Sequence, residues 1–137
     1  MSYAAAYQRT LTETENPRQI ERRLLARVTG DLERQLPHFA AATDLAARLE
    51  VLANGLGQAI WENQRLWLNF VSDLAEPENA LPPQLRAGLI SIGLWVERHS
   101  QQVMRGLADP RPLVEVNQNI VNGLAGIGTS PRLAEEA

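Results

Sequence analysis

The chain has 137 residues, of which 45% are hydrophobic, and its formal net charge is −3. This length is enough for one ordinary hydrophobic core and too short for two. Because there is no cysteine, disulfides, thiol nucleophiles and thiolate metal sites are excluded.

Charge and hydropathy also limit where the chain can act. Every basic residue is an arginine, and residues 1–50 hold seven arginines against seven acids. The chain therefore has no strongly basic segment of the kind that binding to duplex DNA usually requires. The amino terminus has no basic start followed by an apolar core, and no run approaches the roughly 18 apolar residues that cross a bilayer. We therefore expect a cytoplasmic protein with no membrane contact.

The first part of the chain predicts two helices. A short one is expected over residues 2–11, and Asn16-Pro17 is typical of the N-cap and first turn of a longer one. Apolar side chains then recur at Ile20, Leu24, Val28, Leu32 and Leu36, and this second helix is expected to stop at Pro37.

Arginines gather on one face of this second helix, at Arg23, Arg27 and Arg34. Such a stripe could meet RNA phosphates. Asp31 and Glu33 lie close to it, so a solvated, salt-bridged surface is the favoured interpretation.

Residues 43–75 predict one long amphipathic helix. A stripe at spacings of three and four residues runs along it, at Leu45, Leu49, Leu52, Leu56, Ala59, Asn63, Leu66, Phe70 and Leu74. A helix advances about 100° per residue, so these positions share a face. No proline interrupts the stretch, and we expect this helix to be the backbone of the protein.

Two more helices are expected after a proline-rich loop over residues 76–83. The first begins near Pro83, is apolar on nearly all sides in its first half, and should therefore be central. Gly88 and Gly93 in this helix would allow a neighbouring helix to approach closely. Asp109-Pro110 caps the last helix. The prediction is an all-α bundle of four main helices plus the short first one, with a single domain over residues 1–127 and a flexible tail over 128–137.

Catalytic chemistry is not indicated. His38 and His99 lie far apart and head no metal-ligand spacing, so a structural role is favoured for His99. Asp73, Glu76 and Glu78 cluster at a helix end, which favours solvated surface. Nucleotide-binding and nucleophile motifs are absent from the sequence. We expect a protein that is not an enzyme and uses neither a cofactor nor a metal.

Asn63 and Asn117 stand on the apolar stripes of their helices. A buried amide needs hydrogen-bond partners, and two asparagines on facing helices could bond to each other and fix the register of the bundle. The alternative is that each bonds to nearby backbone or water.

A second stripe on the long helix is the stronger functional indication. Trp61 and Leu68 point almost opposite to the main stripe, and Arg65 lies at the same face. Two large apolar side chains in that position either pack on another helix of the chain or form an exposed partner-binding patch. Trp67 falls on the core side of the helix. We take Trp61, Arg65 and Leu68 as the candidate partner-binding residues.

Several strings in order resemble the FlaF family of flagellar biosynthesis regulators. They are Asn63-Gln64-Arg65-Leu66-Trp67, Pro77-Glu78-Asn79-Ala80-Leu81-Pro82, the segment 85–94 and Val116-Asn117-Gln118-Asn119-Ile120-Val121-Asn122-Gly123-Leu124. Tyr3-Ala4-Ala5-Ala6-Tyr7 and Asn16-Pro17-Arg18-Gln19-Ile20-Glu21 are also similar to that family. The resemblance covers residues 3–124.

The resemblance implies a small helical protein that binds flagellin and promotes its synthesis and export, as a chaperone or secretion factor. The regulator FlbT would be a further partner. The alternative function is post-transcriptional regulation, through flagellin messenger RNA or the FlbT repressor. Direct RNA contact is less favoured because the net charge is −3. The sequence leaves monomer and dimer equally open.

Overall fold

The computed structural model describes the backbone of residues 17–129 and the side chains of residues 20–123. Within this range every regular element is helical, as an all-α bundle predicts. The elements are α2 (Pro17–Ala41), α3 (Leu45–Val51), η1 (Leu52–Leu56), α4 (Gly57–Ala75), α5 (Pro83–Met104) and α6 (Arg111–Thr129). The expected short helix over residues 2–11 lies outside the described residues, and so do residues 130–137 of the expected tail.

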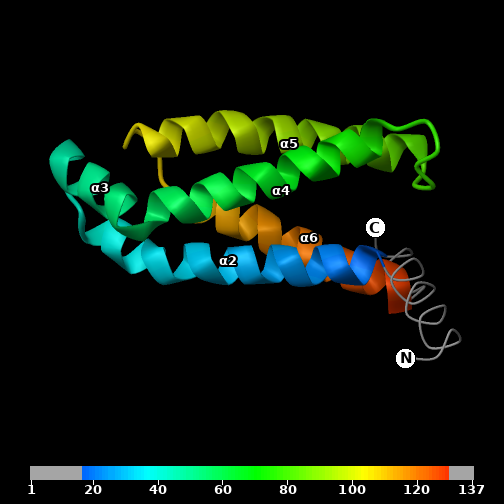
Figure 1. Ribbon diagram of the computed structural model, residues 1–137, viewed down its shortest axis with the longest axis horizontal. Coiled ribbons are helices and arrows are strands. Elements are labelled where there is room, and N and C mark those ends of the chain that lie inside the picture. The colour runs from blue at the N-terminus through cyan, green and yellow to red at the C-terminus, as the bar shows by residue number, and fades with distance from the viewer. Residues whose placement is uncertain (1–16, 130–137) are drawn as a thin grey trace, which may run out of the picture.

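The four long helices run side by side, with α3 closing one end of the bundle (Figure 1). Helix α4 lies in the middle and packs against both α2 and α5, while α6 packs along α2. Helix α5 contacts α4 extensively but touches α6 only slightly. The expectation that α5 is central is therefore wrong. Its apolar circumference is not fully covered, and Leu85 and Leu94 remain exposed.

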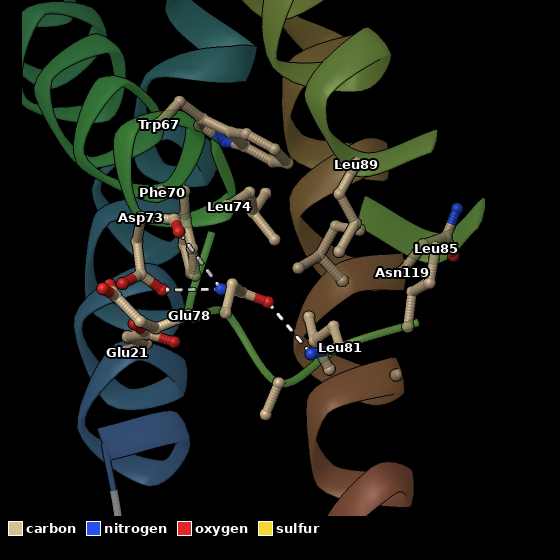
Figure 2. A pocket seen from close by; sticks show the side chains of 14 residues that line it. Glu21, Trp67, Phe70, Asp73, Leu74, Glu78, Leu81, Leu85, Leu89 and Asn119 are labelled. Atoms are coloured by element: carbon tan, nitrogen blue, oxygen red, sulfur yellow. Dashed lines mark hydrogen bonds between the residues drawn. The ribbon is translucent and has the colours of Figure 1, made fainter. Parts of the chain in front are cut away.

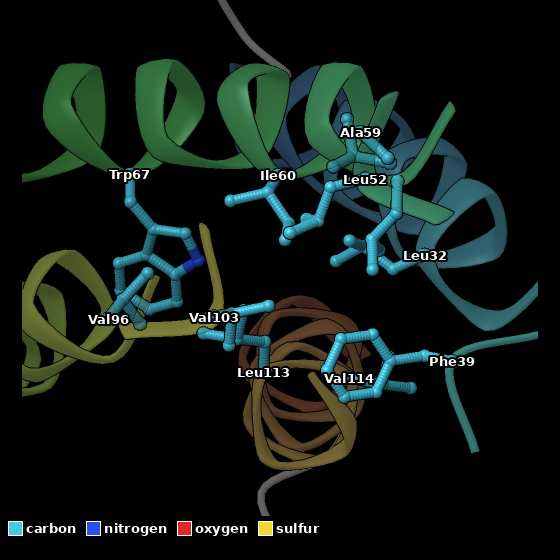
Figure 3. Close-up of a cluster of buried hydrophobic side chains, with 12 residues drawn as sticks. Leu32, Phe39, Leu52, Ala59, Ile60, Trp67, Val96, Val103, Leu113 and Val114 are labelled. Atoms are coloured by element: carbon cyan, nitrogen blue, oxygen red, sulfur yellow. The ribbon is translucent and has the colours of Figure 1, made fainter. Parts of the chain in front are cut away.

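The core lies where α2, α4, α5 and α6 converge (Figure 3). Its buried side chains include Leu32, Ile60, Trp67, Val96, Val103 and Leu113. Burial of such side chains contributes about 1.5–3 kcal/mol each to folding. The bundle is therefore held by ordinary hydrophobic packing, and this packing fixes which face of each helix reaches solvent.

Helix α2 continues through Pro37 to Ala41, so the expected stop at Pro37 is wrong. Proline removes one helical hydrogen bond, but Phe39 and Ala42 beyond it are buried, and their burial offsets the loss. The expected stripe is also shifted, because Leu24 is exposed and its neighbour Leu25 is fully buried.

The expected single helix over residues 43–75 is broken near its middle. Asn54 and Gly55 leave helical geometry, with φ of +134° at Gly55, and the Gly57 N–H bonds to the carbonyl of Leu52 in a widened π turn. L-residues with a side chain avoid such a φ. Asn54-Gly55 is a dipeptide typical of turns, so the sequence did carry a signal for this break that the prediction of one helix overlooked.

The break turns α3 onto the end of the bundle. Arg48 Nη1 donates to the Gly106 carbonyl at 3.1 Å, and the Arg48 guanidinium lies 5.8 Å from the ring centre of Phe39. A Cβ on Gly106 would meet Leu45 and Leu49, so these two side chains cover the turn after α5. They stay partly exposed and do not join the main core as the stripe predicted.

The two glycines of α5 differ. A Cβ at Gly93 would collide with Val71 of α4 and lie 3.5 Å from the Trp67 ring, whereas a Cβ at Gly88 would meet none of the described residues within 4 Å. Close helix approach is therefore confirmed at Gly93 and wrong at Gly88. The loop before α5 and the start at Pro83 agree with prediction.

Candidate partner-binding surface

The outer face of α4 carries the three residues that the sequence selects as a partner-binding patch. Trp61, Arg65 and Leu68 are spaced by four and three residues, so they follow one another along the helix surface. Trp61 is 48% exposed and Leu68 is 65% exposed. The sequence left open whether these two side chains pack on another helix or face solvent. In the structure both face solvent. Their role in binding stays a prediction.

Arg65 contacts the aromatic ring of this patch. Its guanidinium carbon lies 4.9 Å from the centre of the Trp61 ring, within the range of a cation–π contact. The contact limits the rotation of both side chains and places a positive charge at the rim of an apolar surface. Tryptophan and arginine in this arrangement are typical of the residues that dominate protein interfaces.

Leu94 of α5 extends the same surface, and the sequence analysis did not select it. Gln64 Nε2 of α4 donates to the two carboxylate oxygens of Glu97 at 3.4 Å each. Leu68 lies one turn after Gln64, and Leu94 one turn before Glu97. Because α4 and α5 run antiparallel (Figure 1), both leucines lie on the same side of this polar contact. Leu94 is 56% exposed, and we call Trp61, Arg65, Leu68 and Leu94 together the outer surface.

The inner face of α4 carries a buried polar chain that includes both predicted asparagines. Trp67 Nε1 donates to Asn117 Oδ1 at 2.9 Å, and Asn117 Nδ2 donates to Asn63 Oδ1 at 2.8 Å. Both asparagines are fully buried. They bond to each other across α4 and α6, as the first of the two alternatives proposed. Trp67 is a third member of the chain, which the positions of the two asparagines alone do not predict.

The polar chain is not fully satisfied at Asn63, and a buried hydroxyl of α5 outside the chain is also unpaired within the described part of the structure. Asn63 Nδ2 and the Ser100 hydroxyl are buried without a hydrogen-bond partner among the described residues. An unpaired buried polar group costs about 1–3 kcal/mol. The chain therefore fixes the pairing of α4 with α6 at some cost in stability.

The remaining candidates have ordinary structural surroundings. His99 Nε2 lies 2.7 Å from the Asp109 carbonyl oxygen, and its ring stacks on Trp95 at 4.8 Å. Asp73 accepts a hydrogen bond from Asn79 at 3.2 Å. Among the described residues no group of His, Asp or Glu is arranged to hold a metal ion, and none of the described helices is long and apolar enough to cross a membrane.

Comparison with known proteins identifies a matching family. The family model described as flagellar protein FlaF matches residues 3–124 of this chain. No curated protein and no solved structure matches this chain. The matched range contains α2 to α5 and most of α6, and therefore both faces of α4.

Proposed function

Because the chain belongs to the FlaF family of flagellar proteins, we propose that it binds flagellin and promotes its synthesis and export. In this proposal it acts in the cytoplasm as a chaperone or secretion factor and catalyses no reaction. The observation that supports the proposal most is the outer surface of α4 and α5, where Trp61, Leu68 and Leu94 are exposed and Arg65 lies over the Trp61 ring.

The outer surface suits a protein partner with an apolar face. Its residues stand on two long helices packed against each other, so little ordering is needed when a partner binds, and preorganised surfaces bind more tightly. An amphipathic helix would place its apolar side chains between Trp61 and Leu94 and a carboxylate near Arg65. Helix recognition of this kind uses a few large anchors.

Regulation through RNA has less support. The stripe Arg23, Arg27 and Arg34 on α2 is exposed, but Arg34 pairs with Asp31 on the same face. Glu33 also lies there and accepts a hydrogen bond from Gln118 at 2.7 Å. These carboxylates reduce the positive potential that a phosphate backbone requires.

The proposal is tested by calorimetric titration of the full chain with purified monomeric flagellin and, separately, with flagellin leader RNA. We expect saturable binding of flagellin that changes little with salt, and no saturable binding of RNA. Tight, salt-sensitive binding of the RNA together with no detectable binding of flagellin would overturn the proposal and favour the regulatory alternative.

A further inference from the structure

A groove of about 420 Å³ lies between the end of α4, the loop after it, the start of α5 and the middle of α6 (Figure 2). Its walls are mainly apolar and include Phe70, Leu74, Leu81, Leu85, Leu89 and Ile120. The groove exists because α5 packs along α4 and makes few contacts with α6. The apolar sides of α5 and α6 are therefore left apart at this end of the bundle.

The walls of the groove are held in place by hydrogen bonds. Trp67, which lines it, is fixed by the 2.9 Å bond from its Nε1 to Asn117. In the loop, Asn79 Nδ2 donates to both the carbonyl and the carboxylate of Asp73 at 3.2 Å, and Asn79 Oδ1 accepts from the Leu81 N–H at 3.0 Å. The groove is thus formed before any ligand arrives, which lowers the cost of binding.

Negative charge stands on one side of this apolar groove. The carboxylates of Asp73 and Glu78 lie there, on α4 and in the loop (Figure 2). None of the described lining residues is basic. A ligand that fills the groove therefore gains by placing a positive charge at this rim while its apolar part contacts the leucines.

We propose that the groove binds a peptide segment of a partner protein in which apolar side chains stand next to an arginine or lysine. The apolar side chains enter between α5 and α6, and the cation faces Asp73 and Glu78. The volume lies within the range of about 300–1,000 Å³ that is usual for ligand sites. The groove shares no residue with the outer surface, so the inference does not depend on flagellin binding at Trp61.

Two glycines provide a matched pair of variants. Gly123 of α6 lines the groove, and a Cβ there would meet none of the described residues within 4 Å. Gly88 of α5 has equally open surroundings but does not line the groove. Gly123→Leu should place a leucine side chain at the groove, where its Cβ has room among the described residues, and Gly88→Leu adds the same side chain elsewhere. Both replacements favour the helix, because glycine is a poor helix former.

The probe is a fluorescent synthetic peptide with two leucines one helical turn apart and an adjacent arginine, and its control has glutamate in place of the arginine. Binding to the full chain is followed by fluorescence anisotropy, and the contact site by methyl NMR of Leu81, Leu89 and Ile120. We expect the arginine peptide to bind and to shift these methyl signals. Gly123→Leu should weaken binding about tenfold or more, and Gly88→Leu should leave it unchanged. Asp73→Asn with Glu78→Gln should weaken binding and reduce its salt dependence.

Several results would overturn the inference. They are no binding of the arginine peptide, equal binding of the glutamate peptide, or equal affinity of the Gly123→Leu variant and the wild type. Groove methyl signals that shift with protein concentration alone would mean that a second copy of the chain fills the groove, and would also overturn it. Each of these outcomes leaves flagellin binding by the outer surface untouched, because the flagellin titration is read separately.

Discussion

The two faces of α4 use the same residue types for opposite purposes. Trp67 on the inner face is only 3% exposed and donates its indole N–H to Asn117, whereas Trp61 on the outer face is half exposed and contacts Arg65. The two tryptophans are six residues apart on one helix. The inner one is held by the core and a polar chain, and the outer one is available to a partner.

This difference shows that a tryptophan's function here is decided by the neighbours of its helix face. The inner face meets α2, α5 and α6, so its polar atoms must find partners within the bundle. The outer face meets solvent, so its apolar area has no partner within the described chain. The following changes separate the two faces by their effects on stability.

The largest effect is expected for Trp67→Ala. The change removes a buried aromatic side chain and leaves Asn117 Oδ1 without its donor, and buried Trp→Ala changes cost about 3–5 kcal/mol. Trp61→Ala should change the free energy of unfolding by less than about 1 kcal/mol, because half of that side chain is already in water. Urea denaturation measures both. Equal losses in the two variants would contradict the division of α4 into two faces.

A somewhat smaller loss is expected for Asn63→Asp, at least about 2 kcal/mol at neutral pH. Burial disfavours the charged form, so the new carboxyl should have a pKa above its unfolded value of about 3.9. The unfolded state then releases its proton first, and the stability of the variant should fall as the pH rises from the unfolded pKa to the folded one. Chemical denaturation at a series of pH values tests this. A stability difference from wild type that stays constant between pH 3 and pH 8 would mean that this carboxyl is solvated.

The seam between α4 and α5 is tested by Gly93→Ala. The added Cβ would collide with Val71 and press on Trp67, and overpacking of this kind costs about 1–3 kcal/mol. Gly88→Ala is the matched control and should stabilise the protein by up to about 1 kcal/mol, because alanine favours the helix. Thermal unfolding distinguishes the two. A Gly93→Ala variant as stable as the control would show that the seam is looser than the structure indicates.

The sequence was sufficient for an all-α bundle of four main helices, and it offered the pairing of Asn63 with Asn117 and the exposure of Trp61 and Leu68 each as one of two alternatives. Periodicity reports the apolar face of a helix directly, and a buried amide needs a partner. Periodicity does not report backbone breaks, so the stripe from Leu45 concealed the turn at Gly55. It also does not show which apolar face becomes covered. For this reason the periodicity predicts Leu24 in the core where the structure buries Leu25. It likewise predicts α5 at the centre of the bundle, although α5 makes few contacts with α6.

The groove and Leu94 could not be found from sequence for a related reason. Both depend on how far α5 lies from α6 and on its antiparallel register with α4, which are set by contacts such as Gly93 against Val71. The patch of Trp61, Arg65 and Leu68 could be found because it depends on one helix alone.

The most direct test of the proposed outer surface is the affinity of Trp61→Ala and Leu68→Ala for purified flagellin, measured by calorimetry beside their melting temperatures. Leu107→Ala is the control, since Leu107 is as exposed as Leu68 and lies in the turn between α5 and α6. We predict wild-type melting for all three variants and affinity about tenfold weaker or more only for Trp61→Ala and Leu68→Ala. Wild-type affinity in both, with melting unchanged, would contradict the assignment of the outer surface as the flagellin site.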